Sequence, residues 1–200
     1  MIYMSPIPHI PEQFQDRFGY MLSLSGKVFD PVSWWMLDNG EFTKKFKLEK
    51  WLEVLNDKKQ FTSFCKGVVI PDELYDAGRT LDKFWKFVEY VPKEYPIAFV
   101  TQNGVTSKMI PWDNIDTLFI GGDDQHKLKD SFPLINEAHK RGKWVHIGRV
   151  NSPKRIKIFW MADSCDGTHF LKSSNLIRSC QNFLYACEFA KAKKQQRKLI

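Results

Sequence analysis

Short apolar runs alternate with longer amphipathic segments along the 200 residues of this chain. The short runs are rich in branched and aromatic side chains, and several end on Gly, Pro or Asp. This pattern is typical of strands buried in an α/β sheet. Strands are therefore expected at residues 20–24, 34–37, 67–70, 97–101, 117–120, 144–147 and 162–165.

The amphipathic segments carry the 3.6-residue periodicity of helices that pack one face on a sheet. Thr80 is expected to cap the first of these helices. Its core stripe is expected to consist of Leu81, Phe84, Trp85 and Val88. A second stripe consists of Leu128, Phe132, Ile135 and Ala138, and the helix end is marked by Lys140, Arg141 and Gly142. Two further helices are expected at about 153–160, after the capping pair Ser152-Pro153, and at about 175–194.

Strands that alternate with helices pair in parallel through right-handed crossovers, which favours a doubly wound sheet or a (β/α)-barrel. We expect a single α/β domain over residues 1–200, built as a compact (β/α)8-type, TIM-like barrel, with a basic tail at 190–200. Because only seven strands are found and the chain is short for this fold, a trimmed or incomplete barrel is an open alternative.

The chain carries a formal net charge of +7, and its isoelectric point is about 9.2. An excess of Lys and Arg attracts polyanions, so DNA or RNA is a candidate partner, although a solvated basic surface would have the same composition. No apolar run approaches the length needed to cross a bilayer, and the proline-rich start does not resemble a signal peptide. A cytoplasmic protein is therefore expected.

The four cysteines are scattered and form no Cys-x-x-Cys pair. This spacing argues against a disulfide framework and against a compact zinc site. Cys180 and Cys187 could share a helical face, but two turns of helix separate their sulfur atoms too far for one zinc ion. We expect free thiols, no bound metal and no cofactor.

Polar residues follow almost every expected strand, and in parallel α/β folds the carboxyl ends of the strands gather the reactive groups. Carboxylates there can attack an anomeric carbon or exchange protons, and they can accept hydrogen bonds from a purine. Each segment by itself also fits an ordinary turn. The segments are Asp38-Asn39-Gly40, Asp72, Gln102-Asn103-Gly104, Gly121-Gly122-Asp123-Asp124, His146-Ile147-Gly148-Arg149 and Asp163-Ser164-Cys165-Asp166-Gly167-Thr168.

Taken in order, these segments resemble the successive motifs of the tRNA-guanine transglycosylase superfamily, over roughly Asp38 to Thr168. The similarity is closest to the phage and bacterial DNA branch, the 7-deazaguanine DNA transglycosylases. The resemblance implies an enzyme that replaces guanine in DNA by a 7-deazaguanine derivative. It also implies a covalent intermediate between an aspartate and the sugar.

The resemblance implies a role for each matching position. Asp166 matches the nucleophile and Asp38 matches the general acid/base. Asp72 and Gln102 match positions that read the polar edge of the base. The remaining expected pocket residues are Gly121, Gly122, Asn39 and Gly148.

Two departures bear on the substrate. The usual Ser-Gly-Gly-Phe is here Asn39-Gly40-Glu41-Phe42, so part of the pocket differs. The zinc-binding Cys-x-Cys-x-x-Cys of the tRNA enzymes is absent, which favours DNA. A related enzyme that acts on RNA and a non-catalytic nucleic-acid-binding barrel are the alternatives.

The residues around these motifs have less specific interpretations. Arg149, Lys154 and Arg155 are candidates for phosphate binding near the helix that begins at Pro153. Asp163 is expected to be structural, and His146 is expected to be a hydrogen-bonded barrel histidine. Trp51, Trp85 and Trp160 are expected in the core, an exposed position is expected for Trp112, and loop positions are expected for His126 and His169.

Overall fold

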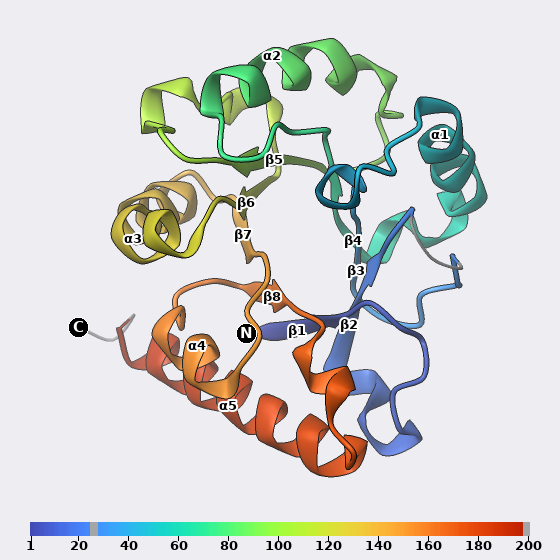
Figure 1. Cartoon of the computed structure of the whole chain (residues 1–200), viewed down its shortest axis with the longest axis vertical. Coiled ribbons are helices and arrows are strands. Elements are labelled where there is room, and N and C mark those ends of the chain that lie inside the picture. Colours follow the sequence, from blue (N-terminus) through green and yellow to red (C-terminus); the bar gives the residue numbers. More distant parts are fainter. Residues whose placement is uncertain (25–27, 198–200) are drawn as a thin grey trace.

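The computed structural model of the chain describes residues 1–24 and 28–197, and eight parallel strands among them close into a barrel (Figure 1). Neighbours in sequence are neighbours in the barrel, and β1 closes the ring by pairing with both β2 and β8. The strands are β1 (Ile2–Ser5), β2 (Phe18–Leu22), β3 (Trp35–Leu37), β4 (Cys65–Val69), β5 (Ile97–Thr101), β6 (Thr117–Ile120), β7 (Trp144–Ile147) and β8 (Ser164–Asp166). The expected TIM-like barrel is confirmed, and its ring is complete.

The strand that the sequence analysis missed is β1. It has four residues, it lies at the start of the chain, and a proline follows it directly, so no run long enough to indicate a strand is present. Its pairing is set by the barrel, because β2 and β8 each leave an edge that β1 covers. The seven expected strands are all present, and none of their ends differs from the expectation by more than two residues.

The α-helices described in the structure surround the barrel, and α4 and α5 lie side by side (Figure 1). Their bounds are α1 (Leu48–Asp57), α2 (Ala77–Phe87), α3 (Asp124–Lys140), α4 (Pro153–Ile158) and α5 (Leu176–Arg197). The crossovers after β1 and β5 contain only short 3-10 turns, such as Glu12–Arg17 and Trp112–Asn114. These short crossovers explain how 200 residues suffice for eight strands.

Methionine side chains fill much of the barrel interior. Met4, Met21 and Met36 come from β1, β2 and β3, and they form one buried cluster with Val69, Ala98 and Val100. Methionine adapts to an irregular space more easily than branched side chains do. Gly67 in β4 keeps this interior narrow, because a Cβ atom there would lie 2.9 Å from Cβ of Ala98. A larger apolar core separates the strands from the helices.

Two expectations for the helix after β4 are wrong. Asp76, not Thr80, caps α2, because its side chain accepts a hydrogen bond from the backbone nitrogen of Arg79 (2.9 Å). Thr80 lies one turn inside the helix, where its hydroxyl bonds the backbone of Glu73. Trp85 is half exposed, since the buried face of α2 is centred on Phe84 and is narrower than the expected stripe.

The buried face of α3 is also rotated relative to the expected stripe. Leu128 is half exposed, whereas the preceding residue, Lys127, is fully buried together with Ser131 and Ile135. His126, expected in a loop, lies in the first turn of α3 and is buried. Polar residues on the core side of this helix hid its true register from a hydrophobicity pattern.

Of the remaining local expectations, the helix ends and the free cysteines are confirmed, and the exposure of Trp112 is wrong. The end of α3 at Lys140 and the Ser152 cap of α4 are as predicted. Trp112 is buried, not exposed, because its ring nitrogen donates to the carbonyl of Ser107 (2.9 Å) and Arg141 covers the ring. All four cysteines are buried free thiols.

The end of the chain continues α5 beyond the expected limit. Residues 190–197 of the expected basic tail belong to this helix, and residues 198–200 lie outside the described part. Ala190 is fully buried, and Lys194 forms an ion pair with Asp163.

Candidate active site

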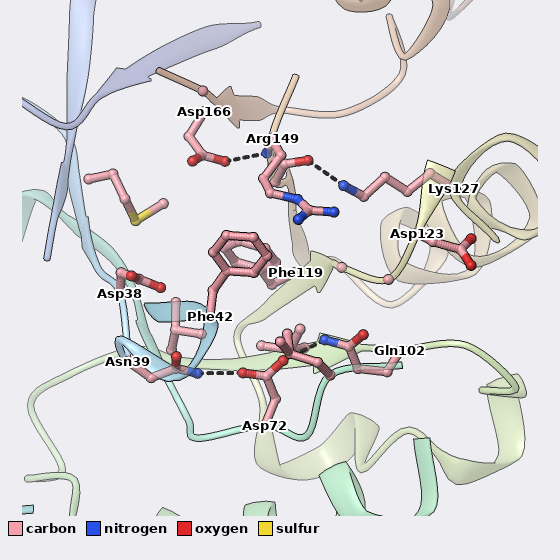
Figure 2. A pocket seen from close by; sticks show the side chains of 18 of the residues that line it. Asp38, Asn39, Phe42, Asp72, Gln102, Phe119, Asp123, Lys127, Arg149 and Asp166 are labelled. Atoms are coloured by element: carbon pink, nitrogen blue, oxygen red, sulfur yellow. Dashed lines mark hydrogen bonds between the residues drawn. The ribbon is translucent and has the colours of Figure 1, made fainter. Parts of the chain in front are cut away.

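A cavity of about 790 Å³ opens at the carboxyl ends of the strands, where the loops after the strands meet. Figure 2 shows its acidic and amide side chains arranged around one common space. Lys154 does not line this cavity, whereas the other expected site residues do: Asp38, Asn39, Asp72, Gln102, Gly121, Gly122, Gly148, Arg149, Arg155 and Asp166.

Asp166 is the last residue of β8, and the two oxygen atoms of its carboxyl group have different surroundings. Oδ1 accepts a hydrogen bond from the backbone nitrogen of Arg149 (2.9 Å) and lies 3.2 Å from Nε2 of His146. Within the described residues, Oδ2 has no hydrogen-bond partner. One oxygen is therefore held by the protein while the other is free to react in the cavity.

Asp38 follows β3 directly, and its backbone nitrogen bonds the carbonyl of Leu22 (2.8 Å), which fixes the start of the loop. Burial, together with the negative charges of Asp166 and Asp72, raises the pKa of Asp38 to about 7. Backbone N–H groups of Gly40 and Asn39 oppose this shift. Asp38 can therefore gain and lose a proton near neutral pH.

The raised pKa of Asp38 predicts a pH-dependent effect on stability. The folded protein disfavours the charged carboxylate, so this group costs stability progressively as pH rises from about 4 towards 7. The free energy of unfolding of Asp38→Asn, relative to that of the wild type, is therefore expected to increase by roughly 2–3 kcal/mol from pH 5 to pH 8. Urea unfolding of both proteins at the two pH values measures this change. A difference between the two proteins that is the same at both pH values would contradict the assignment.

Asp72 lies at the centre of a buried amide network (Figure 2). Oδ1 accepts from Nδ2 of Asn39 (2.8 Å), and Oδ2 accepts from Nε2 of Gln102. Gln102 is oriented in turn by the backbone nitrogen of Tyr75, which donates to its Oε1 (2.9 Å). Burial raises the pKa of Asp72, and the two amide hydrogen bonds oppose that rise. The network holds Asp72 in a fixed orientation as a hydrogen-bond acceptor.

Two glycines keep the backbone close to the cavity. Gly122 has a φ of 76°, a left-handed conformation that glycine adopts at no steric cost. A Cβ atom on Gly148 would lie 2.7 Å from the ring of Phe119, so a side chain there would displace this ring. Both positions therefore require glycine for the shape of the cavity.

A buried lysine that the sequence analysis did not identify joins the site. Lys127 lines the cavity from α3, and its Nζ donates to the carbonyl oxygen of Gly148 (2.7 Å). Burial lowers the pKa of Lys127 to about 8, helped by the neighbouring charge of Arg149. The guanidinium of Arg149 lies 4.6 Å from the ring centre of Phe42, which is itself half exposed. Lys127 and Arg149 thus place two cationic groups at the cavity, on the same side as Asp123 (Figure 2).

The other candidate phosphate-binding residues have different surroundings. Arg155 lines the cavity, but both of its terminal nitrogens bond the carboxylate of Asp124 (2.8 Å each). Lys154 is exposed on α4 outside the cavity. Of the expected group, Arg149 is the residue that lines the cavity and forms no ion pair within 4 Å with a described carboxylate.

Asp163 and His146 have the surroundings expected for structural residues. Asp163 accepts from the backbone nitrogen of Val145 (2.9 Å), lies 3.0 Å from Nε2 of His139 and pairs with Lys194, so its carboxylate is used outside the cavity. His146 is a fully buried, hydrogen-bonded barrel histidine, as expected. Its contact with Asp166 was not foreseen.

No protein-family model and no curated protein sequence matches this chain. Among the described residues, no group of three or more His, Cys, Asp or Glu side chains is placed to hold a metal ion. The helices in the same part of the chain include none that is long and apolar enough to span a bilayer. The assignment of function therefore depends on the chemistry of the cavity.

Proposed function

We propose that this protein is a DNA base-exchange glycosyltransferase that replaces guanine by a 7-deazaguanine derivative. The observation that carries the proposal is that Asp38 and Asp166, from opposite halves of the sequence, line one cavity and influence each other electrostatically. The cavity is large enough for a purine with its sugar, since ligand pockets typically measure about 300–1,000 Å³.

The proposed reaction has two displacements at the sugar. Oδ2 of Asp166 attacks C1′, the bond from C1′ to N9 of guanine breaks, and the electron pair leaves with the base. Asp38, protonated near neutral pH, gives its proton to the departing guanine. The Asp38 carboxylate then removes the N9 proton of the incoming 7-deazaguanine. N9 attacks C1′, and the ester bond to Asp166 breaks. Two inversions return the original configuration.

Asp72 and its amide network provide the recognition of the base. Each carboxylate oxygen accepts one hydrogen bond from Asn39 or Gln102 and retains a second lone pair for the ligand. Guanine and 7-deazaguanine both present N1–H and a 2-amino group, which suit a carboxylate acceptor. Adenine presents an unprotonated N1, which a carboxylate repels. The same pocket can therefore accept both the departing and the entering base.

Asp72→Asn is expected to lower kcat/KM for exchange roughly 10- to 100-fold, because an amide N–H replaces an acceptor that is hydrogen-bonded as an anion. Free guanine and hypoxanthine, which lacks the 2-amino group, should be compared as competitors. The wild type should prefer guanine, and the variant should lose most of this preference. Asp82→Asn, on the exposed side of α2, is the matched control. A variant with an unchanged preference would exclude Asp72 from base recognition.

The basic charge of the chain and the Arg149 guanidinium in the cavity support a polymeric nucleic-acid substrate. A base in a duplex cannot be reached inside the stack, so the target nucleotide must be flipped into the cavity or supplied in a single strand. Phe42, half exposed at the cavity, offers an apolar surface to such a base.

The decisive test of the function is mass spectrometry of nucleosides from nucleic acid incubated with the protein and a 7-deazaguanine. Duplex DNA, single-stranded DNA and tRNA should be supplied in parallel. The proposal predicts a new 7-deazaguanine deoxynucleoside from DNA and an equal amount of released guanine. Product only from tRNA would transfer the same chemistry to RNA. Binding without any product would favour the non-catalytic alternative.

A further inference from the structure

A column of polar side chains runs inside the barrel beneath Asp166. Trp144 and His146 alternate along β7, and Ser164 and Asp166 alternate along β8, with His146 and Ser164 paired in the strand register. Nε1 of Trp144 donates to Oγ of Ser164 (2.9 Å), and Oγ lies 2.9 Å from Nδ1 of His146. Nε2 of His146 lies 3.2 Å from Oδ1 of Asp166.

Hydrogen-bonding chemistry and burial together assign a direction to each hydrogen bond in this column. An indole N–H can only donate, so Oγ of Ser164 accepts from Trp144. A hydroxyl oxygen can accept twice, but Ser164 is fully buried and Nδ1 of His146 is the described acceptor within reach of its hydroxyl hydrogen, so that hydrogen is satisfied when Nδ1 accepts it. A carboxylate can only accept, so Nε2 of His146 must carry the hydrogen that points to Asp166. The ring form that satisfies both ends carries its hydrogen on Nε2 and leaves Nδ1 as the acceptor.

Among the described residues, the imidazole has hydrogen-bond partners only in Ser164 and Asp166. His146 and Ser164 are fully buried, and the Phe119 ring packs on the imidazole with its centre 4.6 Å away. A buried polar group without a partner is costly, and rotation of the imidazole would leave two such groups. The ring is therefore held in one orientation.

We propose that His146 is a positioning residue for the nucleophile, with Ser164 and Trp144 fixing its proton on Nε2. It acts together with the backbone nitrogen of Arg149, and the two donors hold Oδ1 so that Oδ2 faces the sugar. This inference rests on the proposed function. During the attack Oδ2 forms the bond to C1′ and Oδ1 becomes the ester carbonyl oxygen, so the same two donors serve both states. Restricting the carboxylate to one orientation brings the reacting atoms close to attack geometry.

The first test needs no substrate. The nitrogen chemical shifts of the imidazole rings in 15N-histidine-labelled protein report which nitrogen carries hydrogen. The chain has five histidines, and the signals lost in His146→Gln identify those of His146. At pH 7–8 the wild type is expected to show a protonated Nε2 and an unprotonated Nδ1. A protonated Nδ1, alone or together with Nε2, would overturn the proposal.

The second test separates positioning from a merely structural contribution. His146→Leu removes the donor, and it is expected to slow formation of the covalent protein–DNA adduct on the order of 10²-fold in single turnover, with DNA affinity changed less than about threefold. His146→Gln keeps an N–H donor and should recover at least about tenfold of that loss. Equal rates for both variants, or a loss confined to DNA affinity, would overturn the proposal.

The two tests also separate this inference from the proposed function. If the wild type forms no adduct and exchanges no base, while the spectrum shows the expected ring form, the hydrogen-bond column stands and the reaction is wrong. If base exchange proceeds and the spectrum shows hydrogen on Nδ1, the reaction stands and the role of His146 is wrong. Should His146→Leu fail to fold, the spectrum of the wild type and the rate of His146→Gln decide the matter.

Discussion

Asp166→Ala is expected to lower the rate of base exchange by about 10⁴-fold or more and to abolish the covalent adduct with DNA. The reason is that the other carboxylates described in the cavity are engaged elsewhere. Asp38 is the proposed proton carrier, and Asp72 is held by Asn39 and Gln102. Asp123 bonds Asn103 and the start of α3, and Asp124 pairs with Arg155. Removal of an enzymatic nucleophile typically has an effect of this size. The measurement is the incorporation of a labelled 7-deazaguanine into guanine-containing DNA.

Asp163→Asn is the matched control for this experiment. It alters a carboxylate only three residues away whose hydrogen bonds are made with His139, Val145 and Lys194 outside the cavity. We expect it to affect stability while the exchange rate of the folded protein stays close to that of the wild type. Full incorporation by Asp166→Ala, or a loss in Asp163→Asn as large as in Asp166→Ala, would eliminate the proposed mechanism.

Asp38→Asn is expected to slow expulsion of guanine by about 10²- to 10⁴-fold, the usual contribution of a general acid. The pH dependence gives this prediction its specificity. Because the pKa of Asp38 is raised to about 7, the residue is protonated below that pH and loses the proton above it. Adduct formation by the wild type in a single turnover, without added base, should therefore fall as pH rises through about 7.

The residual adduct formation of Asp38→Asn should lack this decline, because the asparagine amide does not titrate. The second half of the reaction should show the opposite trend in the wild type. Transfer of the sugar to an incoming base needs the Asp38 carboxylate, so its rate should rise through the same pH range. A decline near pH 7 that persists in Asp38→Asn would assign the titration to another group.

The fold could be predicted from the sequence because short apolar strands recur along the chain and α-helices follow β3, β4, β6 and β7. Local expectations failed where long-range packing overrode a local signal. β1 is a strand because β2 and β8 both need a partner, and nothing within four residues can express that requirement. Leu128 was expected in the core, but Lys127 occupies the buried position because its ammonium group reaches the carbonyl of Gly148.

The candidate site could be predicted largely because parallel strands bring their carboxyl ends together, so that position in the sequence indicated position in the cavity. This reasoning places Asp38 and Asp166 at the cavity, and their expected roles come from the resemblance. Lys127 and His146 were beyond this reasoning for different reasons. Lys127 reaches the cavity from inside a helix, and no strand end marks it. The role of His146 depends on the register between β7 and β8, which pairs it with Ser164 and places it against Asp166.

The proposed covalent bond between Asp166 and the sugar can be located directly. The protein should be incubated with a guanine-containing DNA oligonucleotide without an acceptor base, denatured, treated with nuclease and digested into peptides for mass spectrometry. We expect a deoxyribose-containing mass addition on the peptide that carries Asp166, and its release when a 7-deazaguanine is added before denaturation. An adduct on a different residue, or base exchange that proceeds without any adduct, would contradict it.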